Sequence, residues 1–345
     1  MTTRVAVVGA GLIGGKRAAA LSPDDELLGV HDTVSGRAIE FAERFGTRAF
    51  VSLQELLAEA PDVVVVATTH DALAAVSVDA LDAGAHVLVE KPAGLCVADI
   101  DRISEASRSA GRLVKVGFNH RFHPGIRQAI ADVRSGDHGP IMFMRARYGH
   151  GGRVGYEREW RADAERSGGG ELIDQGMHLI DLSHALHGDL PLHSALVHTD
   201  FWDMDVDDNA VVMLGAPGRA GPWTMFHVSC SEWKNLFDLE IYCKRAKWHV
   251  TGLAGSYGPQ ILRIFRMKPE MGPPEVEEVS MPGGDVSWEN EWQNFRAAIA
   301  ADDSSLLDGD LGDARYAHAV VQEIYRVSGF RDADGRAIPR DGGPS

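Results

Sequence analysis

Short apolar runs alternate with amphipathic stretches through the first third of the chain. The runs are almost continuously hydrophobic, which is typical of parallel strands covered on both faces. They lie at residues 4–8, 27–30, 63–67, 87–89 and 113–117. Helical spacing of apolar residues predicts helices between them, at residues 12–20, 34–45, 53–59, 71–83 and 98–110. We therefore expect an α/β fold whose first domain, residues 1–122, is a doubly wound parallel sheet.

The pattern changes after Pro124, where strand-like runs follow one another. Helices are predicted at residues 125–134 and 171–186, with a strand at 141–148 and a glycine-rich functional loop at 149–170 between them. Further strands are predicted at residues 195–199, 210–214, 223–229, 236–242, 246–251 and 261–267, and helices at 288–301 and 311–327. Consecutive strands without helices between them indicate a second α/β domain, residues 123–330, with a large, mostly antiparallel open sheet. Residues 331–345, rich in Gly, Asp and Pro, predict a mobile tail.

Composition narrows the class of protein. The 345 residues are 44% hydrophobic, which suits two domains with a sizeable core. The formal net charge of −16 repels nucleic acid and anionic membrane surfaces, so we expect neither as a partner. No apolar run approaches the roughly 18 residues that span a bilayer, and the chain starts with a strand rather than a leader. Three cysteines in no metal-ligand spacing fit a reducing compartment, and we expect a cytoplasmic protein.

A glycine-rich turn follows the first strand, with Gly9, Gly11 and Gly14 in G-x-G-x-x-G spacing. The first glycine allows the tight bend, the second lets the backbone approach a pyrophosphate, and the third allows the next helix to pack closely. Asp32 ends the following apolar run, where a carboxylate accepts hydrogen bonds from ribose hydroxyls and repels a ribose phosphate. The sequence thus predicts a Rossmann dinucleotide site that prefers NAD, while Arg37, five residues further on, keeps NADP open.

Lys91 directly follows the apolar run at residues 87–89 and precedes Pro92. Open α/β sheets bind ligands at the carboxyl ends of their strands. This position therefore favours a functional lysine over a lysine in an ordinary surface turn. The proline restricts the local backbone, and its peptide bond can be cis.

Asp174 and His178 stand four residues apart in the predicted helix after the glycine run. This spacing places both on one helical face, where a carboxylate can orient an imidazole. From the spacing alone, a pair that merely caps and packs is an equally good interpretation. The nearby His184, His187 and His193 follow no common zinc spacing, so we expect no metal site.

Five motifs in order resemble the glucose-fructose oxidoreductase and inositol dehydrogenase family (Gfo/Idh/MocA). They are Gly9 to Gly14, Glu90-Lys91-Pro92, Gly117 to Pro124, the Gly-Gly-Gly-x-Leu-x-Asp-x-Gly-x-His block ending at His178, and Asp207-Asp208-Asn209-Ala210. The resemblance covers most of the chain. It implies that the open sheet of the second domain makes an oligomer contact, and that Lys91, Asp174 and His178 converge in a substrate pocket between the domains.

One loop departs from the family pattern. After the strand at residues 63–67, relatives commonly carry a Thr-Pro-Asn run followed by a histidine. Here the loop continues as Thr68-Thr69-His70, and Leu73 and Ala74 occupy the region of the histidine. Cofactor contacts from this loop are therefore expected only from Thr68 and His70.

These considerations define three sets of candidate residues. The catalytic candidates are Lys91, Asp174 and His178. The cofactor contacts are expected from Gly9, Gly11, Leu12, Ile13, Gly14, Asp32, Arg37, Thr68, His70, Glu90, Lys91 and Asn119. The substrate contacts are expected from Lys91, Arg121, Trp160, Arg161, Asp174, His178, Trp233, Lys234 and Asn235.

The resemblance implies an NAD(P)-dependent oxidoreductase, a homo-oligomer (dimer or tetramer), that moves a hydride between nicotinamide and a secondary alcohol of a sugar, inositol or nucleotide-sugar. Losing a hydride requires that the hydroxyl proton also leaves, so a base must lie within hydrogen-bond reach of that oxygen. His178 oriented by Asp174, or Lys91, can be that base, and the sequence leaves both assignments open. Two alternatives are an NAD-dependent glycoside hydrolase that oxidises its sugar transiently, and a non-catalytic sugar or NAD sensor.

Overall fold

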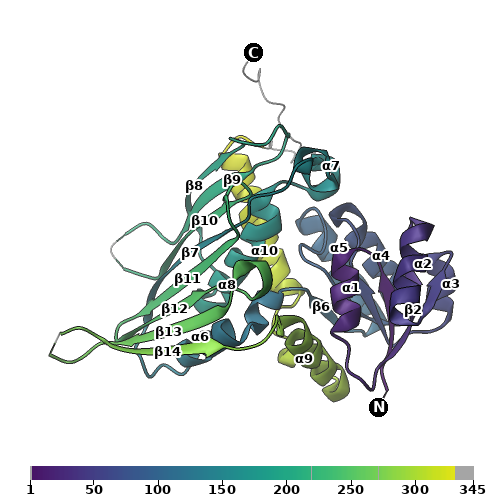
Figure 1. The fold of residues 1–345 in the computed structure, drawn as a ribbon, viewed down its shortest axis with the longest axis horizontal. Coiled ribbons are helices and arrows are strands. Elements are labelled where there is room, and N and C mark those ends of the chain that lie inside the picture. Colours follow the sequence, from purple (N-terminus) through teal and green to yellow (C-terminus); the bar gives the residue numbers. More distant parts are fainter. Residues whose placement is uncertain (1, 219, 271, 331–345) are drawn as a thin grey trace. The chain divides into compact units, whose positions relative to one another are not determined.

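The computed structural model describes residues 2–218, 220–270 and 272–330 (Figure 1). The tail expected at residues 331–345 lies outside them. The chain divides into two compact units. Among the described residues, unit 1 comprises residues 2–119 together with Ser287–Arg315, and unit 2 comprises those of His120–Val286 together with residues 316–330.

Unit 1 is built on a six-stranded parallel sheet in the order β3-β2-β1-β4-β5-β6. Its strands are β1 Arg4–Val8, β2 Glu26–His31, β3 Arg48–Phe50, β4 Val63–Val66, β5 His86–Val89 and β6 Val114–Val116. Its helices include α1 Leu12–Ala19, α2 Ser35–Phe45, α3 Leu53–Ala58, α4 His70–Asp82 and α5 Val97–Ala110. All four residues of β4 are buried, as a strand covered on both faces requires. The expected Rossmann sheet is confirmed, and only the short edge strand β3, with two of its three residues exposed, was not predicted.

Helix α9, Ser287–Ala301, was expected in the second domain but packs in unit 1. Trp292 and Phe295 on this helix join the core formed by strands β1, β2 and β4. Its Glu291 reaches the buried Arg17 of α1 at 2.5 Å and Lys115 of β6 at 3.1 Å. The local pattern of the helix could not show this partner, because the contacts join residues far apart in the sequence.

Unit 2 contains an eight-stranded sheet in the order β14-β13-β12-β11-β7-β10-β9-β8. All of its strand pairs are antiparallel except β10 with β7, which agrees with the expected, mostly antiparallel sheet. The strands are β7 Ile141–Gly149, β8 Leu192–His198, β9 Asn209–Leu214, β10 Trp223–Ser229, β11 Leu236–Cys243, β12 Ala246–Thr251, β13 Gln260–Arg266 and β14 Glu275–Met281. Strand β14 escaped prediction because its residues are almost all exposed and four of its seven positions are not apolar.

One face of this sheet carries the helices of unit 2. These are α6 Pro124–Arg134, α8 Met177–His187 and the part of α10 Leu311–Val327 that follows Arg315; α6 and α8 contact the strands directly (Figure 1). The strands alternate accordingly, so that Val212, Leu214 and Phe226 are buried while Val211, Met213 and Met225 are at least 37% exposed. This alternation is the mark of a sheet with a covered and an uncovered face.

The segment between β7 and α8 contains short helical turns rather than one open loop. They are η2 Tyr156–Arg158, η3 Trp160–Ala162, α7 Ala164–Ser167 and the π-helical turn η4 Leu172–Gly176. The predicted single helix at residues 171–186 is therefore a π turn followed by α8. Asp174 lies in the wider π turn and His178 in the α-helix, so the four-residue spacing does not correspond to a regular α-helical face.

The Arg17 network provides a test of what holds unit 1 together. Arg17 is 3% exposed and bridges Glu90 and Glu291, so Arg17→Met leaves carboxylates without their main buried partner. We expect a loss of about 3–5 kcal/mol in the unfolding free energy of unit 1, measured by urea denaturation followed by tryptophan fluorescence. Arg108→Met, at an exposed ion pair with Glu105, is the control and should cost less than about 1 kcal/mol. An equal, small loss in both variants would contradict this role.

Candidate active site

The glycine turn of unit 1 has the geometry that a dinucleotide site needs. Gly9 has φ +102°, and a Cβ there would lie 2.3 Å from the carbonyl oxygen of Ala67. A Cβ on Gly14 would lie 2.0 Å from the carbonyl oxygen of Gly9, so helix α1 packs directly on the turn. A Cβ on Gly11, in contrast, would meet nothing within 4 Å. The two outer glycines are thus required by packing, whereas the middle one leaves room for a ligand.

The surroundings of this turn also fit a dinucleotide. No side chain caps the start of α1, where Leu12 is 78% exposed, so the helix presents its N-terminal amides to a phosphate. The Asp32 carboxylate accepts backbone hydrogen bonds from Ala10 and Val34, both at 2.8 Å, which fixes it beside the turn. Arg37 is exposed.

Several other candidates gather at the same edge of the sheet. Strands β1, β4 and β5 are parallel neighbours, so the residues after their carboxyl ends, Gly9, Thr68 and Lys91, share this edge. Lys91 is half-buried, and its peptide bond to Pro92 is cis. His70 is buried at the first turn of α4.

Glu90 and Asn119 are engaged inside unit 1. The Glu90 carboxylate accepts a hydrogen bond from Arg17 Nε at 2.6 Å, and burial raises its pKa even though Arg17 opposes the shift. The Asn119 amide donates to the hydroxyl of Ser287 at 2.9 Å. These contacts hold the backbone next to the sheet edge that Gly9, Thr68 and Lys91 share.

In unit 2, each glycine of the run before Asp174 has a specific packing reason. Gly168 has φ +78° and ends α7, while Gly169 has φ +153° and a Cβ there would lie 2.2 Å from the Tyr325 hydroxyl. A Cβ on Gly170 would lie 1.8 Å from the carbonyl oxygen of Asp207. All three glycines are buried, so the run is tightly packed rather than flexible.

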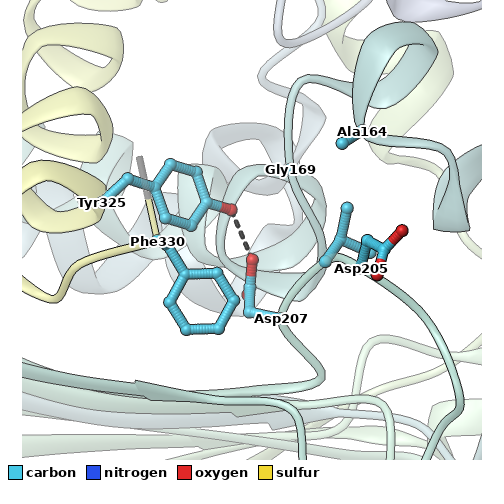
Figure 2. A pocket seen from close by; sticks show the side chains of 7 residues that line it. Ala164, Gly169, Asp205, Asp207, Tyr325 and Phe330 are labelled. Atoms are coloured by element: carbon cyan, nitrogen blue, oxygen red, sulfur yellow. Dashed lines mark hydrogen bonds between the residues drawn. The ribbon is translucent and has the colours of Figure 1, made fainter. Parts of the chain in front are cut away.

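Asp207 fixes the start of the π turn. Its fully buried carboxylate accepts hydrogen bonds from the amides of Gly170 at 2.9 Å and Leu172 at 2.7 Å. It also accepts one from the Tyr325 hydroxyl at 2.5 Å, which Figure 2 shows. The adjacent cavity measures about 10 Å³, close to the space for one water, and is far too small for a sugar. We conclude that this part of the Asp207 motif is structural.

Asp174 projects from the π turn toward an arginine. Its Oδ2 lies 3.1 Å from Arg161 Nε, and the Arg161 guanidinium stacks 4.6 Å from the centre of the Trp160 ring. Burial lowers the pKa of Arg161, but the charge and hydrogen bond of Asp174, together with Tyr156 and Glu159, outweigh that effect, so the net shift is upward. The structure therefore brings together three predicted residues, Trp160, Arg161 and Asp174.

His178 belongs to a stack of rings that the sequence did not reveal. Its imidazole is buried and lies 3.7 Å from the His120 ring, centre to centre, with Tyr148 5.1 Å from His120. Tyr148 in turn hydrogen-bonds Tyr257, and burial raises the pKa of both phenols, so both remain protonated. His120 belongs to the Gly117 to Pro124 motif, so its place in the sequence offered some indication of its role. No motif pointed to Tyr148 or Tyr257.

A second carboxylate, Glu171, also escaped prediction. Its side chain is completely buried, and Oε2 lies 3.5 Å from Nε2 of His150. Burial raises the pKa of Glu171 to about 7, helped by the charges of Asp174 and Asp207 and opposed by His150. Glu171 fills an unspecified position of the glycine motif, so the motif did not draw attention to it.

The other predicted substrate contacts are dispersed within unit 2. Arg121 forms a buried, two-pronged ion pair with Asp181 at 2.6 and 2.8 Å, so its guanidinium is committed to the protein. Trp233 is 94% exposed, and Lys234 is exposed beside it. Asn235 donates to Ser256 at 2.8 Å.

The histidines after His178 have ordinary roles. His184 contacts Asp189 at 2.9 Å and stacks on Tyr316, and burial lowers the pKa of His187 to about 4. Within residues 2–218, 220–270 and 272–330, no group of three or more ligating side chains could hold a metal ion. No helix in this part of the chain is long and apolar enough to cross a bilayer.

Comparison with known proteins defines the class. Residues 3–118 match the family model described as "Oxidoreductase family, NAD-binding Rossmann fold", and residues 126–249 match "GFO/IDH/MocA C-terminal domain". The chain therefore belongs to the GFO/IDH/MocA oxidoreductase family, which confirms the resemblance inferred from its motifs.

Individual relatives of the chain are named as dehydrogenases. The chain is 31% identical over 203 residues to D-glucoside 3-dehydrogenase of Escherichia coli strain K12, covering 57% of each protein. It is 31% identical over 155 residues to inositol 2-dehydrogenase of Salmonella paratyphi B, covering 43% of this chain and 46% of the relative. The chain thus spans about half the length of these curated relatives. Levoglucosan dehydrogenase in complex with NADH has the same fold, with a TM-score of 0.85 at 19% identity over 95% of this chain and 97% of that one.

Gly170 gives the most direct test of the packing around Asp207. Gly170→Ala forces a methyl group into the Asp207 backbone, so we expect at least a 10-fold loss of any turnover and a destabilisation of about 3 kcal/mol or more, measured by thermal unfolding and assay. Gly284→Ala is the control, since a Cβ there meets nothing within 4 Å and should change stability by less than about 0.5 kcal/mol. A Gly170→Ala protein as stable as the control would overturn this assignment.

Proposed function

We propose that this protein is an NAD-dependent dehydrogenase that oxidises a secondary alcohol of a polyhydroxylated ring, or reduces the corresponding ketone. The observation that supports it best is in unit 2, where Arg161 holds Asp174 beside Trp160 in the segment that leads to the buried His178. The second support is Lys91, placed at the same sheet edge as the glycine turn.

The proposed chemistry divides between the two units. Bound NAD supplies the hydride acceptor. His178 accepts the hydroxyl proton of the substrate, Asp174 orients His178, and Lys91 donates a hydrogen bond to the same oxygen to stabilise its developing charge. In the alternative assignment, Lys91 accepts the proton and His178 donates the hydrogen bond.

The proposed cofactor contacts are the turn from Gly9 to Gly14, Asp32, Thr68 and His70, with Glu90 and Asn119 as positioning residues. NAD is preferred because Asp32 is fixed beside the turn by two backbone hydrogen bonds. A carboxylate held there accepts hydrogen bonds from ribose hydroxyls and repels a ribose phosphate. Arg37, which is exposed, is the residue that would favour NADP.

The proposed substrate is a sugar, an inositol or a nucleotide-sugar. The names of the two curated relatives indicate oxidation of ring hydroxyls in a glucoside and in an inositol. Trp160, stacked with Arg161 next to Asp174, offers an aromatic face of the kind that packs on sugar rings. The exposed Trp233 and Lys234 provide further contacts, whereas Arg121 contributes by holding Asp181.

We further propose that the protein is a homo-oligomer, a dimer or tetramer, that associates through the uncovered sheet face of unit 2. Among its outward residues, Met213, Trp223 and Met225 are only 36–37% exposed, and Phe143 stacks on Trp223 at 4.5 Å, which makes an apolar area suited to an interface. A mass of one chain by sedimentation equilibrium would contradict this assembly. The unpaired cysteines and the need for NAD support a cytoplasmic location.

Substitution of the two proposed reacting groups tests the chemistry. Lys91→Met and His178→Asn should each lower kcat by about 100- to 10,000-fold and leave the Kd for NAD within about threefold, because both act on the substrate oxygen. The assay follows reduced nicotinamide with a panel of glucosides, inositols and nucleotide-sugars. Lys268→Met and His193→Asn, at outlying positions, should retain full turnover.

The outcomes of this assay separate the competing functions. Hydrolysis without accumulation of reduced nicotinamide would identify a glycoside hydrolase that recycles its cofactor. NAD or sugar binding without turnover across the whole panel would identify a sensor. Loss of NAD binding in the Lys91 or His178 variant would move that residue to a cofactor role.

Asp32 tests the choice of cofactor. Asp32→Ala removes the ribose acceptor and the charge that repels a phosphate, so NAD should bind at least about 10-fold more weakly while NADP binds more tightly, as measured by titration of protein fluorescence. Asp71→Ala, in the first turn of α4, is a control for the loss of one acidic charge in unit 1. An unchanged ratio of NAD to NADP affinity in Asp32→Ala would refute the ribose contact.

A further inference from the structure

Glu171 is a buried acid that the proposed chemistry does not use. Its side chain has no exposed surface, and neither of its oxygens makes a close hydrogen bond to another described residue. Its nearest ionisable partner is His150, with 3.5 Å between Oε2 and Nε2. A carboxyl group so placed is costly unless it holds a proton or faces a cation, so its charge must depend on its neighbours.

The hydrogen bonds of His150 define which nitrogen faces Glu171. The amide of Gly152 donates to Nδ1 of His150 at 3.0 Å, so Nδ1 is the acceptor of the ring. Nε2 therefore carries the proton and points it toward Glu171. The His150 side chain is 19% exposed, whereas Glu171 is fully buried, so the pair exchanges protons with solvent through His150.

Groups from several elements act on this pair. Tyr156 and Arg161 approach from η2 and η3, Asp207 from the segment before β9, and Cys230 from the end of β10. Asp174 follows in the same π turn, and Tyr148 and Tyr257 complete the surroundings. Burial raises the pKa of both Cys230 and Tyr156, so neither supplies charge near neutral pH.

The charged groups near the pair are therefore one cation, Arg161, and two carboxylates, Asp174 and Asp207. Arg161 is committed to Asp174, and Asp207 is satisfied by its own three donors. Glu171 raises the pKa of His150 against the effect of burial, as expected of two groups that interact at 3.5 Å.

We propose that Glu171 and His150 form a proton-holding pair that sets the protonation state of His178 through the charge beside Asp174. Glu171 is then a positioning residue. Its effect on turnover rests on the proposed function, in which His178 accepts the hydroxyl proton. When the pair loses its proton to solvent, a second negative charge appears next to Asp174. That charge favours the imidazolium form of His178, which cannot accept a proton from an alcohol.

The direction and size of the effect follow from electrostatics. An ionised Glu171 raises the proton affinity of His178, so a neutral residue at position 171 lowers it. A buried charge about 10 Å from an imidazole changes its proton affinity by about 10-fold, or about one pH unit. The acid limb of kcat/KM for alcohol oxidation should move to lower pH by the same amount.

The test measures the imidazole pKa values of His150 and His178 by NMR in the full chain labelled at histidine, without cofactor or substrate. His150→Gln and His178→Gln assign the two signals. Glu171→Gln should lower both values by about one unit, and Glu171→Leu should do the same if the glutamine variant does not fold. Glu171→Asp keeps the charge, so the pKa values of His150 and His178 should fall by no more than half of the fall seen in Glu171→Gln. Glu165→Gln, at an exposed position of the same segment, should change neither pKa.

The outcomes separate the pair from the proposed reaction. An unchanged His150 pKa in both neutral variants would overturn the pair, and a fall at His150 with no change at His178 would overturn its effect on the site. Neither result needs turnover, so an inactive wild-type protein would contradict the proposed function while leaving the pair to be judged by NMR. With an active enzyme, an acid limb of kcat/KM that stays in place in Glu171→Gln would overturn the link to catalysis.

Discussion

A single buried carboxylate determines how the candidate site of unit 2 is built. Asp207 accepts two backbone amides from the start of the π turn and one hydroxyl from α10, so its lone pairs are satisfied without any charged partner. The close approach requires glycine at position 170, where a side chain would collide with the backbone of Asp207. Because this turn leads into α8, the positions of Glu171, Asp174 and His178 all follow from it. The acidic motif before β9 and the glycine motif before α8 therefore pack against each other and together fix the π turn.

The two units handle buried charge differently. In unit 1, Arg17 and Lys115 face Glu90 and Glu291, two basic groups against two carboxylates, and the guanidinium of Arg17 keeps its proton near neutral pH. Such a network fixes geometry, and here it joins the residue before Lys91 to the returning helix α9. In unit 2, the partner of the buried Glu171 is a histidine, His150, a residue type that can gain or lose its proton in the physiological pH range. The first network suits a rigid cofactor edge, whereas the second suits a site whose charge responds to its surroundings.

The sequence was informative wherever one local pattern determines the structure. The strand and helix periods located nearly every element of both units, and the glycine spacing located the nucleotide turn. Local patterns could not show that α9 returns to unit 1, because its partners Arg17 and Lys115 lie far away in the sequence. They also missed the π turn, since helical spacing does not distinguish five-residue from four-residue hydrogen bonding. The stacking of His120 on His178 and the contact of Glu171 with His150 depend on tertiary packing, so no spacing rule could reveal them.

We propose that Lys91 and His178 act on one hydroxyl group of the substrate. The most direct measurement is a crystal structure of the protein with NAD and a ring polyol that it oxidises slowly. The account predicts that Lys91 Nζ and one ring nitrogen of His178 each lie within about 3.2 Å of the same substrate oxygen, with the reacting carbon facing the nicotinamide. A bound polyol whose reacting hydroxyl contacts neither group would contradict it.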